Sequence, residues 1–307
     1  MTDSKFTGNA AAFIASVLFG ASVVATRMAV GSIPPLSLAL LRFGQGGLIL
    51  LISLIIFRPD LLRVRLSDLP YLSLLGAVLF TIFPITFNLG LKYTEASRGA
   101  LMLATVPLWS AGLARIAKSE HLILRQVGGI ILTLGGVAFV LAERGLTWQG
   151  GIGALVGDLL MLLTAICGAI YGVLAQKMLK KYNAITVTTY AMLTGTCLLI
   201  PAAFVEGLPQ ALTKIDFQAA GLILFLGICG GAVGYFLWTF ALAYLTPTQV
   251  AVYINLNLMA ATILGAVLLA EKLTPVFISG FVAVLIGVLL VNWPTKIVSE
   301  PLPDSSH

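Results

Sequence analysis

The chain has 307 residues, of which 59% are hydrophobic and 10% charged, and its mean hydropathy is +1.04. Soluble domains carry about 25% charged residues, and so few charges cannot cover the surface of a globular protein of this size. The composition excludes a soluble enzyme, a disordered chain and a nucleic-acid binder. It predicts an all-α polytopic membrane protein.

Ten apolar runs follow one another between Pro, Gly and charged breaks, and each is near the length of about 20 residues that a spanning helix needs. We expect the first run to be a mature helix, because it exceeds signal-peptide length and has no cleavage signal before Arg27. No connection could hold an ATP-binding domain. The runs are 8–28, 36–57, 70–91, 97–117, 124–142, 152–176, 185–205, 217–242, 248–270 and 274–293.

The distribution of basic residues predicts the orientation. With the N-terminus inside, eleven of the 18 Lys and Arg fall in cytoplasmic segments and five in outer segments, while Arg27 and Arg42 lie within apolar runs. Cytoplasmic loops of membrane proteins are enriched in Lys and Arg. The excess of Lys and Arg on the inner side therefore predicts cytoplasmic N- and C-termini, and it accounts for the net charge of +6 without nucleic-acid binding.

An internal repeat predicts the architecture. A shift of 151 positions aligns the fourth and fifth runs with the ninth and tenth, placing Glu120 on Glu271, Gly129 on Gly280 and Gly136 on Gly287. A unit of five helices crosses the membrane an odd number of times, so the second copy is inverted. Residues 8–142 and 152–293 are thus predicted to form two inverted five-helix repeats, a typical feature of secondary transporters. The alternative is a duplicated structural membrane protein.

The two halves resemble the drug/metabolite transporter superfamily, and within it the EamA-type exporters. The residues that carry the resemblance include Phe19-Gly20-Ala21-Ser22, Thr105-Val106-Pro107 and Glu271-Lys272-Leu273 with Gly280 and Gly287. The chain is most similar to the YddG branch of amino-acid and aromatic-metabolite exporters, which implies a multi-pass protein of the bacterial inner membrane. It differs from the family pattern in the ninth run, where Asn255-Leu256-Asn257-Leu258 stands at a place that often holds proline.

Polar and aromatic residues at mid-depth are the candidates for substrate contact, because lipid-facing positions do not require them. They would line an uncharged cavity with aromatic walls, which suits a zwitterion with an apolar side chain. Ten residues form this candidate set: Ser22, Phe83, Asn88, Met102, Trp109, Tyr171, Tyr235, Trp238, Tyr253 and Asn257.

Each candidate also has a structural interpretation. Asn257 could hold neighbouring helices together, and Trp109 could belong to an interfacial belt. Arg42 would cost about 3 kcal/mol if it faced lipid, so it either pairs with helix-end carbonyls or binds a substrate carboxylate. Glu120 and Glu271 are placed to stabilise helix N-termini or, alternatively, to couple protons.

Other classes of function fit less well. The chain lacks Gly-x-Ser-Gly, His-Glu-x-x-His, Gly-x-Gly-Asp and P-loop sequences, so we predict no enzyme, no cofactor and no metal. The three cysteines have neither disulfide nor metal spacing. We predict a secondary transporter that exports amino acids by alternating access and favours aromatic or large neutral ones. Its predicted partners are a small-molecule substrate and membrane lipid, and we expect a monomer to be sufficient for transport. An exporter of lipophilic cationic drugs or other small metabolites is the alternative.

Overall fold

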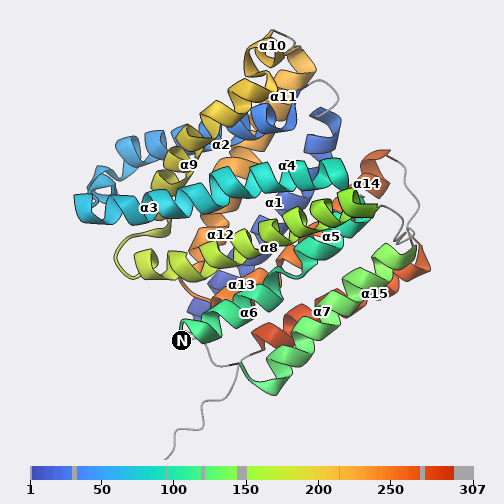
Figure 1. The fold of residues 1–307 in the computed structure, drawn as a ribbon. Helices are drawn as coiled ribbons and strands as arrows, with labels where there is room; N and C mark the ends of the chain where they lie inside the picture. The colour runs from blue at the N-terminus through green and yellow to red at the C-terminus, as the bar shows by residue number, and fades with distance from the viewer. Residues whose placement is uncertain are drawn as a thin grey trace, which may run out of the picture.

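The computed structural model describes residues 2–29, 33–94, 96–118, 122–143, 151–213, 215–269 and 274–293, and these residues are almost entirely helical (Figure 1). The helices follow the predicted runs closely. The bounds of the α-helices are α1 Thr2–Ala29, α2 Pro35–Phe57, α3 Leu69–Gly76, α4 Phe83–Tyr93, α5 Ala96–Ala104, α6 Val106–Ile116, α7 Leu124–Glu143, α8 Gly151–Leu179, α9 Ala184–Glu206, α10 Leu208–Leu212, α11 Phe217–Phe225, α12 Gly234–Leu242, α13 Pro247–Ala251, α14 Ile254–Leu269 and α15 Pro275–Asn292.

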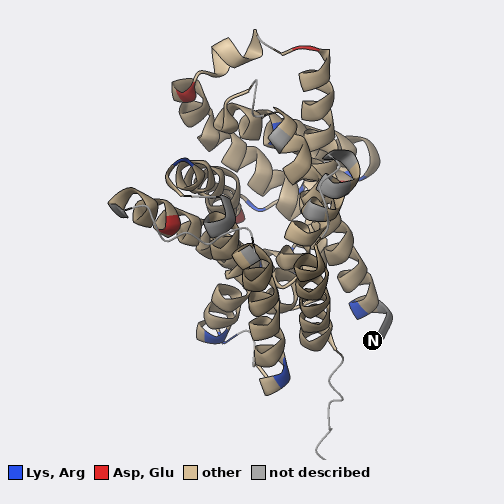
Figure 2. Cartoon of the chain, turned by 90° about the vertical axis from the view of Figure 1, so that its right-hand side faces the viewer, with Lys and Arg blue, Asp and Glu red and all other residues tan. Residues whose placement is uncertain are grey.

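Within the described residues, nine helical segments are long and apolar enough to cross a membrane. They correspond to the predicted runs except the ninth, which is interrupted between α13 and α14. Most of the ribbon carries neither basic nor acidic side chains (Figure 2). The chain is an all-α polytopic membrane protein, as the composition predicts.

Two predicted runs differ from the single helices expected. The run 97–117 is divided at Thr105, because Pro107 lacks an N–H group and the chain turns with a bond from Thr105 N to Met102 O. The run 248–270 is divided at 252–253, where Asn255 and Leu256 donate backbone hydrogen bonds three residues back. This second break contains no proline. The first run also begins earlier than predicted, at Thr2.

Local sequence sets several helix ends. Thr246 and Gln249 form a reciprocal capping box at the start of α13. The Thr274 hydroxyl accepts from Phe277 N at the start of α15. Helix α9 ends at Gly207, whose φ of 110° is accessible to glycine without strain. These signals place the turns within a residue or two of the predicted breaks.

Two π-helical segments occupy the middle of the third and eighth crossings. The segment η3, Ala77–Ile82, joins α3 to α4, and η4, Leu226–Val233, joins α11 to α12. Gly227, Gly230 and Gly231 give η4 little side-chain bulk. Because η3 and η4 stand about 150 positions apart, they fall on each other in the repeat alignment.

The packing of helices also follows the internal repeat, since equivalent helices of the two halves have equivalent neighbours. Helix α1 packs on α12 and α14, and α8 packs correspondingly on α4 and on the pair α5 and α6. Helix α2 packs along α9, and α7 lies along α15 at one edge of the bundle (Figure 1). Each of the last two pairs joins equivalent helices of the two halves.

The contact between α7 and α15 is made through glycine. A Cβ atom on Gly129 would lie 2.7 Å from Gly287 O, and one on Gly136 would lie 2.8 Å from Gly280 O. Since lipid offers no hydrophobic driving force between helices, such close backbone approach is a main source of association. The repeat alignment matches Gly129 to Gly280 and Gly136 to Gly287, so the observed pairs are crosswise, as a two-fold relation between the helices requires.

Candidate substrate site

Six aromatic side chains gather where the two halves of the chain meet, and we call them the aromatic cluster. The ring centroids of Phe80 and Tyr235 are 4.9 Å apart, those of Phe19 and Tyr235 4.9 Å, and those of Phe43 and Phe80 5.2 Å. Helices α1 and α2 and segment η3 supply three of the rings, and α8 and α12 supply the others. The aromatic cluster consists of Phe19, Phe43, Phe80, Tyr171, Tyr235 and Trp238.

Three members of the predicted set belong to this cluster: Tyr235, which contacts three of its rings, and Tyr171 and Trp238. Tyr171 is fully buried, and its hydroxyl lies 2.8 Å from the Thr239 hydroxyl. Its ring meets Phe80 edge to face at 6.4 Å. Trp238 is 8% exposed and lies 6.0 Å from the Phe19 ring. The packing fixes the direction of both side chains.

Arg42 places a positively charged side chain beside the aromatic cluster. Its Nη2 donates to Gly230 O at 2.9 Å, and its guanidinium carbon lies 5.3 Å from the Phe43 ring and 5.9 Å from the Tyr235 ring. These distances suit cation–π contact. The Nε of Arg42 is buried and has no hydrogen-bond partner. Arg42 therefore contacts a carbonyl within η4 rather than at a helix end.

Segment η4 lets polar groups approach its backbone closely. A Cβ on Gly230 would collide with Ser22 Oγ and lie 2.9 Å from Arg42 Nη2. The Ser22 hydroxyl itself donates to Leu18 O at 2.7 Å. One turn earlier, a Cβ on Gly227 would collide with the Gln45 side chain. The predicted residue Ser22 thus lies beside the aromatic cluster, on the side of Arg42.

A second group of predicted residues lies on α4, α5 and α6. Asn88 Nδ2 donates to Pro84 O at 2.7 Å, and Trp109 Nε1 donates to Thr105 Oγ1 at 3.1 Å. Phe83 packs 6.3 Å from Phe87, and Met102 is half-buried. None of the ring contacts in the described part of the chain joins this group to the aromatic cluster.

The residues predicted on the ninth crossing have different environments. The Tyr253 hydroxyl donates to Asn9 Oδ1 at 2.9 Å, which ties it to the N-terminal part of α1. The backbone of Asn257 lies against Gly20, and its Oδ1 is buried without a partner. The neighbouring Asn255 is 1% exposed, and neither of its amide atoms has a hydrogen-bond partner.

Several residues singled out in the sequence fall beyond what the structure describes. Glu120 and Glu271 lie outside the described residues, and so does the side chain of Arg27. Across the described part of the chain, no group of three or more His, Cys, Asp or Glu is arranged to hold a metal ion.

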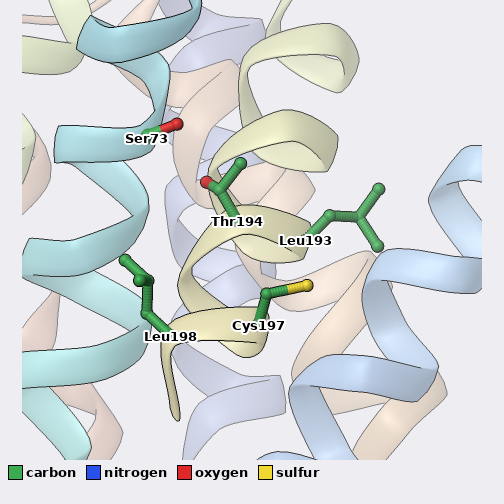
Figure 3. A pocket seen from close by; sticks show the side chains of 5 residues that line it. All are labelled: Ser73, Leu193, Thr194, Cys197 and Leu198. Atoms are coloured by element: carbon green, nitrogen blue, oxygen red, sulfur yellow. The ribbon is translucent and has the colours of Figure 1, made fainter. Parts of the chain in front are cut away.

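A groove on the outside of the bundle lies apart from these residues (Figure 3). It has a volume of about 330 Å³ and lies between α3 and α9. Leu198 is 53% exposed there, and the lining contains no member of the predicted set. Figure 3 labels the lining residues: Ser73, Leu193, Thr194, Cys197 and Leu198.

The predicted set omitted Phe19, Phe43, Phe80 and Arg42, all of which belong to the arrangement around η4. Arg42 could have been found as an arginine inside an apolar run, and Phe43 is the next residue in the sequence. Which partner an intramembrane arginine finds depends on helix packing, which the sequence pattern does not specify.

Known proteins resemble this chain over most of its length. An uncharacterized transporter of Bacillus subtilis, YyaM, is 28% identical and covers 92% of each chain. A probable terminal-alkyne amino-acid exporter of Streptantibioticus cattleyicolor is 27% identical over 75% of each chain. A solved crystal structure has a TM-score of 0.79 at 16% identity, covering 94% of this chain and 96% of the other, and so shares the fold.

A family model matches twice along the chain, over residues 6–142 and 155–293. The two matches leave out little besides the termini and the connection before α8. The chain belongs to the EamA-like transporter family.

Proposed function

We propose that this transporter exports amino acids, preferring aromatic or large neutral ones, across the inner membrane of a bacterium. The observation that carries the proposal is the aromatic cluster with its polar neighbours Ser22, Arg42 and Thr239, to which both halves contribute. Such a site offers apolar walls for a side chain and a few fixed polar groups for the α-carbon substituents. The amino-acid exporter among the relatives supports the same substrate class.

The mechanism we propose is alternating access between two inverted five-helix repeats, 8–142 and 152–293. The crosswise glycine pairs of α7 and α15 and the equivalent positions of η3 and η4 support this relation. In inverted-repeat transporters the substrate site lies near the midplane between the repeats. Rocking of one half against the other would expose the aromatic cluster to either side in turn.

The orientation we propose has both termini in the cytoplasm. With this orientation, the connection from α2 to α3 is cytoplasmic and carries Arg58, Arg63 and Arg65, and the α8–α9 turn carries Lys180 and Lys181. Excess Lys and Arg in cytoplasmic loops supports this assignment. We expect a monomer to be sufficient for transport, with no cofactor and no catalytic activity.

The substrate residues we propose are the ten predicted from the sequence, in two groups. Ser22, Tyr171, Tyr235 and Trp238 belong to or adjoin the aromatic cluster. The others would line the path on α4, α5, α6 and α14 and at the break between α13 and α14: Phe83, Asn88, Met102, Trp109, Tyr253 and Asn257.

The alternative function is export of lipophilic cations or other small metabolites. Arg42 argues against cations, because its guanidinium contacts two rings of the aromatic cluster and would repel a cation there.

Liposomes containing the purified full chain, loaded with a labelled panel of amino acids and with a lipophilic cation, test the proposal. We expect efflux of phenylalanine, tyrosine or large neutral amino acids above that of protein-free liposomes. Movement of the lipophilic cation, with none of the amino acids, would replace this function with the alternative.

A further inference from the structure

The position of Arg42 is unusual for a charged side chain. It is the eighth residue of α2, so it lies about 10 Å along the helix from Pro35, where the helix begins. Its neighbours are aromatic rings and the glycine-rich backbone of η4. An arginine in such a place is normally neutralised by a partner or bears a function.

No carboxylate among the described side chains neutralises this arginine. Four acidic side chains that the structure describes in or beside the membrane-spanning helices are engaged elsewhere. Glu206 accepts from the backbone of Leu36 and Ser37, and Asp158 accepts from Thr94. Asp216 caps α11, and Asp68 pairs with Lys181.

The guanidinium is also poorly satisfied by hydrogen bonds. Among the described residues Arg42 makes one hydrogen bond, from Nη2 to Gly230 O, while arginine carries five N–H donors. The buried Nε has no acceptor in the part of the chain that the structure describes. The side chain as a whole is half-buried, so part of it remains accessible. A planar anion that accepts two parallel hydrogen bonds is the natural complement of such a group.

We propose that Arg42 binds the carboxylate of the transported substrate, and that the aromatic cluster binds the apolar group attached to it. The assignment rests on the proposed function and narrows it to substrates with a carboxylate beside an apolar or aromatic group. Phe43 and Tyr235 hold the guanidinium by their ring faces, and the missing side chain at Gly230 leaves room for it. Amines that lack a carboxylate would meet an uncompensated positive charge and be rejected.

Competition among three ligands that share a phenyl ring tests this assignment on the wild-type protein. Liposomes containing the full chain are assayed for counterflow of labelled phenylalanine against unlabelled phenylalanine, 3-phenylpropionate and phenethylamine. We expect the two carboxylates to compete and the amine not to compete. Equal competition by phenethylamine would overturn the role of Arg42.

Variants test the same residue directly. Arg42→Gln is expected to weaken the apparent affinity for phenylalanine about 10- to 100-fold, the size of effect for losing a charge-assisted hydrogen bond, with Arg42→Lys in between. Arg63→Gln, which changes an exposed loop arginine, is the matched control and is expected to behave as wild type. Wild-type affinity in Arg42→Gln would refute the assignment even where amino-acid transport is confirmed.

The two proposals fail in different ways. Absence of amino-acid counterflow in the wild type would contradict the proposed function. In that case, binding of a carboxylate at Arg42 would still be measured by the change in thermal stability of the purified protein when ligand is added. Stabilisation by 3-phenylpropionate but not by phenethylamine would support it, and the reverse or neither would overturn it.

Discussion

Replacing Gly136 with alanine is expected to disrupt the contact between α7 and α15. The new Cβ would lie 2.8 Å from Gly280 O and 3.1 Å from both Ala283 Cβ and Val284 Cγ2. The first neighbour is a backbone atom, so the helices must separate by several tenths of an ångström. Overpacking of this kind costs about 1–3 kcal/mol.

The measurement is the thermal stability of the purified protein in detergent, with Gly135→Ala as the control. Gly135 is on the same helix, and a Cβ there would meet no atom within 4 Å. With a shift of roughly 2–4 °C per kcal/mol, the Gly136→Ala variant should unfold several degrees below the control. Equal stability of the two variants would refute the close approach of the helices.

Three further substitutions test other parts of the structure. Trp238→Ala removes a ring of the aromatic cluster, and we expect the apparent affinity for substrate to fall about tenfold while the protein still inserts into the membrane. Transport at the wild-type level would mean that Trp238 has a structural role only. Asn257→Ala is expected to lower transport without lowering thermal stability, because Asn257 Oδ1 has no hydrogen-bond partner to lose; reduced stability with normal transport would contradict this. Glu206→Gln should lower the free energy of unfolding by about 1 kcal/mol, because the carboxylate accepts hydrogen bonds from Leu36 N and Ser37 N at the positive end of α2. The control Asp60→Asn changes an exposed carboxylate and should leave stability unchanged. Thermal unfolding of the two variants tests this, and equal stability would contradict it.

Helix positions could be predicted from the sequence because the membrane imposes a length and a composition on every crossing. The runs 36–57 and 217–242 differ by at most one residue from α2 and from the stretch α11 to α12. The break between α13 and α14 could not be predicted, since no proline or glycine marks it. The π-helical segments were equally unmarked, although the glycines of η4 permit one.

The candidate site was predicted less completely than the helices, because the sequence does not specify which helices pack against one another. Periodicity says which side chains share a face of one helix, but not which helix covers that face. Tyr171 was predicted to contact substrate, yet its hydrogen bond with Thr239 depends on α8 packing against α12. For Arg42 the sequence left helix-end carbonyls and a substrate carboxylate as the possible partners. Its contact with the backbone of η4 depends on how α2 packs against that segment, which the sequence does not specify.

The two π-helical segments have a consequence for how the chain tolerates changes in length. A single-residue deletion in an ordinary α-helix rotates everything beyond it by about 100° and would turn inward-facing side chains toward lipid. A π-helical turn already contains a residue more than the α-helical turn it replaces. A deletion within η4 can therefore be absorbed by reverting that turn to α-helix, leaving Tyr235 and Trp238 on their original face. The third and eighth crossings should accept such deletions at their centres, where the uninterrupted helix α9 should not.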